Sequence, residues 1–291
     1  MSRFDSIAKR SLLLTMAATS CLAGAGCQSE SRITLALGVP TTVQDSGLLD
    51  WLLPAFGVDH PGIQVRFVAA GSGELLALGA RGDLDVLLSH SPAAELKFVS
   101  QGFAVERRPL MQNDFLIVGP PADPAAVRGR TDAVDALAAI ASAGAAFFSR
   151  GDESGTHRKE LELRETGGIP AGGRGYRESG EGMGAVLRAA SETGAYTLVD
   201  RATYLNLRDL VDLVILVEGD PRLLNVYSVL VTKNARQPEA ARTFADWLTS
   251  QNGRSAIAAY GTDLFGRSLF QPIVSYPESP DEPASLATLT R

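Results

Sequence analysis

Three consecutive units, each made of an apolar strand, a short loop and an amphipathic helix, dominate the first third of this chain. The expected strands are residues 33–39, 63–68 and 84–88, and a helical pattern follows each of them. This alternation is typical of a parallel, doubly wound sheet. In such sheets the ligand lies beyond the carboxyl ends of the strands, so we expect a binding site at the loops after these strands.

The three loops carry neutral hydrogen-bond donors rather than pairs of titratable side chains. These donors are Thr41, Thr42, Ser46, Ser72, Ser89 and Ser91. One such residue alone most often serves as a helix cap, but their recurrence after every strand places several donors near helix N-termini at one edge of the sheet. Because the free backbone N–H groups of helix N-termini favour anions, the pattern predicts an oxyanion-binding cup.

A second anion-binding segment is expected at residues 147–157. A short apolar strand ends at Phe148, and a glycine-bearing loop then leads into a helical pattern that Ser154 or Thr156 can cap. The helix N-terminus offers free N–H groups, and Arg150 adds a full charge and a planar set of donors. A capped strand-to-helix turn with a surface arginine is the alternative, and this segment alone does not decide between the two.

The strand pattern predicts two lobes. A strand at 113–120 leaves the first lobe, and a strand at 226–232 matches it in length and provides the return. We therefore expect one lobe from residues 32–116 plus 228–291 and another from 117–227. The expected fold class is α/β, with each lobe a doubly wound mixed sheet flanked by helices and the two joined by two hinge crossovers.

Residues 1–27 have the features of an export signal, with Lys9 and Arg10 before an apolar run and small residues. Cleavage by ordinary signal peptidase after residues 23–25 competes with a lipoprotein signal that ends at Cys27, and we expect Cys27 to be lipidated. Both cysteines of the chain lie in this segment, so the mature protein has no disulfide and no cysteine metal site. The protein is expected to be exported, either periplasmic or anchored to the cell membrane as a lipoprotein.

The charge of the chain limits its partners. The net charge is −6, and because the leader carries +2 the remainder is at −8. This balance argues against nucleic acid or an anionic membrane surface as the main partner. A small anion remains possible, because local donors dominate at contact distance.

Several separated blocks of the sequence carry a family resemblance. They include QDSGLL at 44–49 and ARGDLDVLL at 80–88, followed by 91–95, 113–115, 149–159, 180–184, 194–198 and 200–201. In this order they resemble the substrate-binding proteins of tungstate ABC transporters, members of the type II periplasmic-binding-protein fold. One departure is Val39-Pro40 before Thr41, where the family usually has hydroxyl residues.

The resemblance implies that a tetrahedral oxyanion, tungstate or molybdate, is held between two closing lobes and delivered to a membrane permease and its ATPase. By position it implies the ligand donors Thr41, Thr42, Ser72, Arg150, Ser154, Gly155 and Thr156. No cofactor, cation site or nucleic acid is implied, and the expected state is a monomer. A pocket of donors without a nearby carboxylate selects a deprotonated oxyanion, and it rejects phosphate because nothing accepts the phosphate proton.

The main alternative is a secreted hydrolase that uses Ser154 or Ser72 as nucleophile and His90 as base. The chain has no Gly-x-Ser-x-Gly motif, which makes this chemistry improbable. Of the other two histidines, His60 is expected at the surface, and His157 is expected to face solvent or lie beside the rim of the cup.

Two further alternatives have weaker support. A cation site would need Asp45, Asp85, Asp152 and Asp200, which follow different elements without the spacing of metal ligands. The tripeptide Arg-Gly-Asp, found in adhesion sites, occurs at 81–83 and 150–152. Both copies lie in segments expected to be structured, and the tripeptide is frequent by chance.

Overall fold

The structure is a computed structural model that describes residues 32–274. The expected export signal, including Cys27, lies outside the described residues. Within residues 32–274, no helix has both the length and the apolar character needed to cross a membrane.

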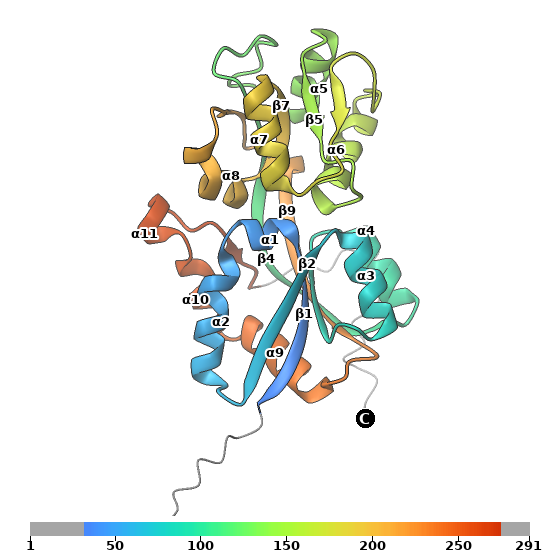
Figure 1. Cartoon of the computed structure of the whole chain (residues 1–291), viewed down its shortest axis with the longest axis vertical. Helices are drawn as coiled ribbons and strands as arrows, with labels where there is room; N and C mark the ends of the chain where they lie inside the picture. Colours follow the sequence, from blue (N-terminus) through green and yellow to red (C-terminus); the bar gives the residue numbers. More distant parts are fainter. Residues whose placement is uncertain (1–31, 275–291) are drawn as a thin grey trace, which may run out of the picture. The chain divides into compact units, whose positions relative to one another are not determined.

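The described part of the chain alternates strands and helices (Figure 1). Its strands are β1 Ile33–Pro40, β2 Ile63–Ala70, β3 Val86–Ser89, β4 Ala104–Gly119, β5 Phe147–Ser149, β6 Tyr176–Glu178, β7 Tyr196–Asp200, β8 Val214–Val217, β9 Leu224–Thr232 and β10 Gln271–Pro272. Its helices are α1 Thr41–Asp45, α2 Leu48–Asp59, α3 Ser72–Arg81, α4 Pro92–Ser100, α5 Ala133–Ser142, α6 Gly155–Thr166, α7 Met183–Thr193, α8 Arg201–Leu207, α9 Pro238–Thr249, α10 Gln251–Ala259 and α11 Thr262–Phe265, with 3-10 turns η1 Arg208–Leu210 and η2 Pro221–Leu223.

The strands form two mixed sheets that share β4. In the first sheet β1 pairs in parallel with β2 and β3, while β9 pairs antiparallel with β3 and β4. In the second sheet β5 pairs in parallel with β6 and β7, while β4 pairs antiparallel with β7 and β8. The expected parallel arrangement of the first three strands is confirmed, and we refer to the elements around the two sheets as the first and second lobes.

Two long strands, β4 and β9, are the crossovers between the lobes. They lie side by side in Figure 1 and pair in the first sheet as far as Asp114↔Leu224. From Phe115↔Asp200 onward, β4 instead pairs with β7 of the second sheet. The change of partner at residues 114–115 therefore marks where the chain passes from one lobe to the other.

Both faces of each sheet are covered by helices, as a doubly wound fold requires. In the first lobe, one apolar cluster joins the sheet to α2, α9 and α10, and another joins it to α3 and α4. In the second lobe, Phe115 and Ile117 of β4 pack toward α5 and α6, whereas the intervening Leu116 and Val118 pack toward α7 and α8. Successive side chains of a strand point to opposite faces, so a buried strand needs an apolar run of this kind.

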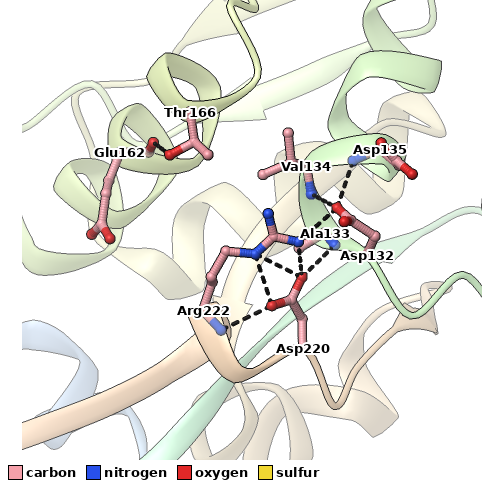
Figure 2. Close-up of polar contacts among 8 residues, drawn as sticks. All are labelled: Asp132, Ala133, Val134, Asp135, Glu162, Thr166, Asp220 and Arg222. Atoms are coloured by element: carbon pink, nitrogen blue, oxygen red, sulfur yellow. Dashed lines mark hydrogen bonds and ion pairs between the residues drawn. The ribbon is translucent and has the colours of Figure 1, made fainter.

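A polar cluster ties the start of the second crossover to α5 (Figure 2). Asp132 caps α5, and Asp220, which begins the turn before β9, accepts a hydrogen bond from the Ala133 amide at 2.7 Å. Arg222 forms ion pairs with both carboxylates, 2.6 Å from Asp220 and 2.7 Å from Asp132. Its guanidinium holds the pKa of Asp220 down to about 2. The cluster thus fixes one end of the hinge strand to the second lobe.

Candidate functional site

The loops after β1 and β2 present hydroxyl side chains at the start of short helical segments. Thr41 and Thr42 open α1 directly after Pro40; Thr41 is half-buried and Thr42 fully buried. Ser72 opens α3 and is only 1% exposed. Small polar side chains suit these positions because the first N–H groups of a helix have no partner within the helix.

The segment after β5 forms the expected strand, loop and capped helix N-terminus. Ser154 caps α6, and its Oγ accepts a hydrogen bond from the His157 amide at 3.3 Å. The Arg158 amide then donates to the Ser154 carbonyl at 2.9 Å, which is the first bond of the helix. The amides of Gly155 and Thr156 precede that bond, so the helix itself supplies them with no acceptor. The capping role predicted for this segment is confirmed at Ser154.

Arg150 lies between this segment and the first loop of the other lobe. The residue is only 2% exposed, and its Nη2 donates to Thr41 Oγ1 at 3.0 Å. The same nitrogen also contacts the Asp152 carboxylate. The alternative of a surface arginine is therefore wrong, because Arg150 is buried and faces the loop that carries the predicted threonines.

Three loops of the first lobe meet the segment 150–155 of the second. Thr41 after β1 bonds to Arg150, and Gly71 after β2 lies so close to the Asp152 carbonyl that a Cβ would be 3.3 Å from it. His90 after β3 lies against Gly155, where a Cβ would collide with the imidazole. The predicted convergence of the strand-end loops is thus found in the structure.

The site also contains a group of buried polar atoms without hydrogen-bond partners. Among the described residues these include Thr42 Oγ1, Ser72 Oγ, Ser89 Oγ, His90 Nε2, Ser91 Oγ, Arg150 Nε and Thr156 Oγ1. A buried polar group left unpaired costs roughly 1–3 kcal/mol, so folded proteins rarely retain several in one region. Their concentration on loops that converge is the arrangement expected of a site completed by a polar ligand.

Two expectations about acceptors near the site are wrong. The Asp152 carboxylate contacts Arg150 and accepts a hydrogen bond from the Ser154 amide at 3.1 Å, so a carboxylate does lie beside the donors. His90 Nε2 is a second potential acceptor, which removes the argument that nothing in the site accepts the proton of phosphate. The Asp152 carboxylate lies beside Arg150 because a buried guanidinium needs a counter-charge.

The first loop is held to the second lobe by further contacts that sequence reasoning missed. Asp45 Oδ2 accepts a hydrogen bond from the Gly184 amide at 3.3 Å, and the Asp45 carbonyl accepts one from Asn206 at 2.8 Å. Thr203 Oγ1 donates to the Thr42 carbonyl at 3.2 Å. Burial raises the pKa of Asp45 despite the Gly184 amide, which acts in the opposite direction.

The three histidines differ in their surroundings. His60 is half-buried and packs against Phe56, with the two rings tilted and their centroids 4.9 Å apart. His157 is only 5% exposed, and its Nδ1 accepts a hydrogen bond from the Glu153 amide at 3.1 Å. Of the two expected placements, exposure to solvent is therefore excluded, and a position beside the predicted cup stays a prediction. His90 is equally buried, and burial lowers its pKa to about 4.

Neither predicted nucleophile is paired with the predicted base. In the part of the chain that the structure describes, Ser154 Oγ serves the α6 cap, Ser72 Oγ is unbonded, and His90 bonds through Nδ1 to Asn225. Residues 32–274 also contain no group of three or more His, Cys, Asp or Glu side chains able to hold a metal ion. The burial of Arg150 equally keeps the second Arg-Gly-Asp tripeptide from serving as an exposed adhesion motif.

Comparisons with known proteins agree with this geometry. Residues 28–252 match the PBP superfamily domain. The chain is 42% identical over 283 residues to the tungstate-binding protein TupA of Peptoclostridium acidaminophilum, covering 94% of this chain and 99% of that protein. The chain belongs to the family of tungstate-binding proteins within the PBP superfamily.

Two solved structures extend the similarity to the fold. The tungstate ABC transporter structure from Geobacter sulfurreducens is 42% identical, with a TM-score of 0.72, and covers 78% of this chain and 98% of its own. The tungstate-binding protein TupA from Desulfovibrio alaskensis G20 is 39% identical, with a TM-score of 0.68, and covers 84% and 100%. These relatives are named for tungstate binding or tungstate transport and not for hydrolysis, so the hydrolase alternative is not favoured. The resemblance seen in the sequence blocks is confirmed.

Proposed function

We propose that this protein is the extracytoplasmic solute-binding component of an ABC importer and that its ligand is a tetrahedral oxyanion, with tungstate first and molybdate as its nearest competitor. The observation that carries this proposal is the Arg150–Thr41 hydrogen bond between the lobes, set among buried donors that lack partners. Relatives that are 42% and 39% identical to this chain are named as tungstate-binding proteins, which supports the choice of ligand.

The ligand donors of the proposal are side-chain hydroxyls, the guanidinium and the first amides of α6. They are Thr41, Thr42, Ser72, Arg150, Ser154, Gly155 and Thr156. Because the Ser154 hydroxyl is engaged in the cap, Ser154 acts chiefly by orienting the helix N-terminus, whereas the next two residues offer their amides. A bound dianion would then take the place of Asp152 as the main partner of Arg150.

The number of donors is sufficient for tight binding. Each charge-assisted hydrogen bond contributes roughly 1.5–3 kcal/mol net. Nanomolar affinity corresponds to about 12 kcal/mol, which several such bonds supply after the costs of desolvation and closure. A fully deprotonated tetrahedral oxyanion accepts at every corner, so a cup of N–H and O–H groups satisfies its ligand and its own unpaired atoms together.

Capture in this proposal occurs by closure of the lobes about β4 and β9. We assign residues 32–116 plus 228–291 to the first lobe and 117–227 to the second, and the closed monomer delivers the anion to a permease and its ATPase. Export through the leader, with lipidation at Cys27, would keep the protein outside the cytoplasm. Mass spectrometry of the membrane fraction, with Cys27→Ala as the control, tests the lipid anchor.

The ligand assignment is tested by heating the purified mature protein with tungstate, molybdate, sulfate or phosphate. A ligand that binds only the folded state raises the melting temperature by mass action. We expect the largest rise with tungstate, a similar one with molybdate and a smaller one with sulfate. If no oxyanion raises the melting temperature while ester or phosphate hydrolysis is measurable, the hydrolase alternative replaces this proposal.

A further inference from the structure

The imidazole of His90 lies at the junction of both lobes and both crossover strands. Its ring stacks on Tyr227 of β9 at a centroid distance of 5.0 Å and an angle of 7°, and on Phe115 of β4 at 6.3 Å. The Nε2 edge faces Gly155, the first residue of α6, where an added Cβ would collide with it. Nε2 is buried and has no hydrogen-bond partner among the residues described.

A chain of amide side chains fixes which nitrogen of His90 carries the proton. Asp200 Oδ1 accepts hydrogen bonds from the Thr203 amide at 3.0 Å and from Asn113 Nδ2 at 3.2 Å. Asn113 Oδ1 in turn accepts from Asn225 Nδ2 at 2.8 Å. Because Asp200 Oδ1 accepts at its end of the series, Asn113 must direct its NH₂ group toward Asp200 and its oxygen toward Asn225. The orientation of both amide side chains is thereby fixed.

This series of hydrogen bonds, the relay, ends at the imidazole of His90. Asn225 Oδ1 is left as an acceptor 3.1 Å from His90 Nδ1, so Nδ1 carries the hydrogen. In the neutral ring Nε2 then has a bare lone pair aimed at the α6 N-terminus. Asn113 and Asn225 face each other on β4 and β9, so this relay runs from the second lobe through the hinge to the first.

The groups around His90 explain why the free protein keeps the ring neutral. Burial is the main cause that lowers the pKa of His90, the Arg150 charge lowers it further, and the Asp152 carboxylate acts in the opposite direction. Asp200 is connected to His90 through the relay, and His157 lies in the first turn of α6, two residues after Gly155. The neighbours on β4 and β9, namely Phe115, Asn225 and Tyr227, are uncharged at neutral pH.

We propose that His90 contacts the bound oxyanion and takes up one proton as the anion binds, so that Nε2 changes from a bare acceptor to a donor. This inference rests on the proposed function. A lone pair directed at a dianion is repulsive, and a proton between them converts repulsion into a charge-assisted hydrogen bond. A dianion beside Arg150 also supplies the negative charge that offsets the cost of a buried imidazolium.

The proton can come from solvent to Nε2 or arrive on the oxyanion as its monoprotonated form. In both cases the complex holds one proton more than the free protein and the free dianion together, and no other bond is made or broken. Linkage then requires the affinity for the dianion to rise as the pH falls, by up to tenfold for each pH unit.

Isothermal titration of the mature protein with sodium tungstate measures this uptake directly. Titrations at about pH 6, about pH 7 and about pH 8 in buffers of different ionisation enthalpy give the number of protons bound with the anion. We expect an uptake near one proton and a matching slope of affinity against pH. Binding with no proton uptake and no slope would overturn the role of His90 and leave the proposed function intact, whereas no binding at any pH would overturn both.

Variants assign the proton to its residue. His90→Gln places a non-titrating amide near the Nε2 position, and we expect it to lose both the proton uptake and the pH slope. His60→Gln and His157→Gln are the controls, and both should retain the uptake. Uptake that persists in His90→Gln and disappears in His157→Gln would contradict the proposal. Nitrogen-15 NMR of the wild-type imidazoles provides a measurement without mutation, with His90 Nε2 bare in the free protein and protonated in the tungstate complex.

Discussion

The Arg150 guanidinium donates a hydrogen bond to Thr41 Oγ1 at 3.0 Å, although the two residues lie in different lobes and are 109 positions apart. The same guanidinium has an unbonded, buried Nε and contacts the Asp152 carboxylate. Arg150 therefore joins the first-lobe loop to its local counter-charge, Asp152, which in turn accepts a hydrogen bond from the Ser154 amide at the start of α6.

Replacing Arg150 with Ala should weaken tungstate binding by at least roughly a hundredfold, because charge-assisted hydrogen bonds of roughly 1.5–3 kcal/mol each are lost. The measurement is calorimetric titration. The matched control is Arg158→Ala in α6, whose side chain is 41% exposed and pairs with Glu153. Equal affinities of the two variants would show that the guanidinium of Arg150 does not face the ligand.

Replacing Asp152 with Asn should change ligand binding and stability in opposite directions. Loss of the carboxylate removes a competitor for Arg150, so tungstate affinity should increase by roughly tenfold, whereas the free protein should melt at a lower temperature because a buried charge loses its partner. Titration calorimetry and thermal unfolding measure the two effects. Glu153→Gln makes the same charge change at a side chain that is 69% exposed, and it should have little effect on either.

Replacing Gly155 with Ala tests the close approach of α6 to His90. An added Cβ would collide with the imidazole, so the variant should bind tungstate at least about tenfold more weakly. Because the imidazole is buried, the same collision should lower the melting temperature of the ligand-free protein. Gly73→Ala, at an exposed position of α3 with no atom near the added Cβ, is the control. An unaltered affinity of Gly155→Ala, measured by titration, would contradict the contact.

Asp200 should make the stability of the protein depend on pH. Burial raises its pKa from 3.8 to about 6, so between these values the folded state binds more protons than the unfolded state. The free energy of unfolding contributed by Asp200 must therefore fall as pH rises from about 4 to about 6, by roughly 3 kcal/mol in total.

Other groups act in the same pH range, so the comparison must be made against a variant. The lowered pKa of His90, about 4, makes stability rise with pH and partly hides the effect of Asp200. Asp200→Asn keeps the Oδ1 acceptor for Asn113 and removes the titration. Urea unfolding across the range should show the difference between wild type and variant changing with pH, and a constant difference would contradict the raised pKa.

The sequence predicted the features that depend on local patterns. The three strand–loop–helix units predict the first sheet because apolar runs and capping residues act over a few positions. Ser154 was predicted as one of two caps for the same reason. The convergence of Thr41 and Arg150 required the family resemblance as well, because no local pattern reports a contact between distant segments.

The remaining features arise from contacts between distant segments. β4 begins at Ala104, well before its apolar stretch. Charged residues such as Arg107 and Arg108 interrupt the apolar pattern there, so the sequence alone does not indicate the first half of this strand. The relay from Asp200 to His90 exists only because Asn113 and Asn225 oppose each other in the pairing of two strands. The carboxylate of Asp152 was missed because its need follows from the burial of Arg150, which the sequence does not show.

The most direct test of this account is a crystal structure of the mature protein with tungstate. We predict an oxyanion between the lobes, with the guanidinium of Arg150, the hydroxyls of Thr41 and Thr42, and the first amides of α6 within hydrogen-bond distance of its oxygens. An oxyanion bound elsewhere, or an Arg150 side chain directed away from it and still paired with Asp152, would contradict the account.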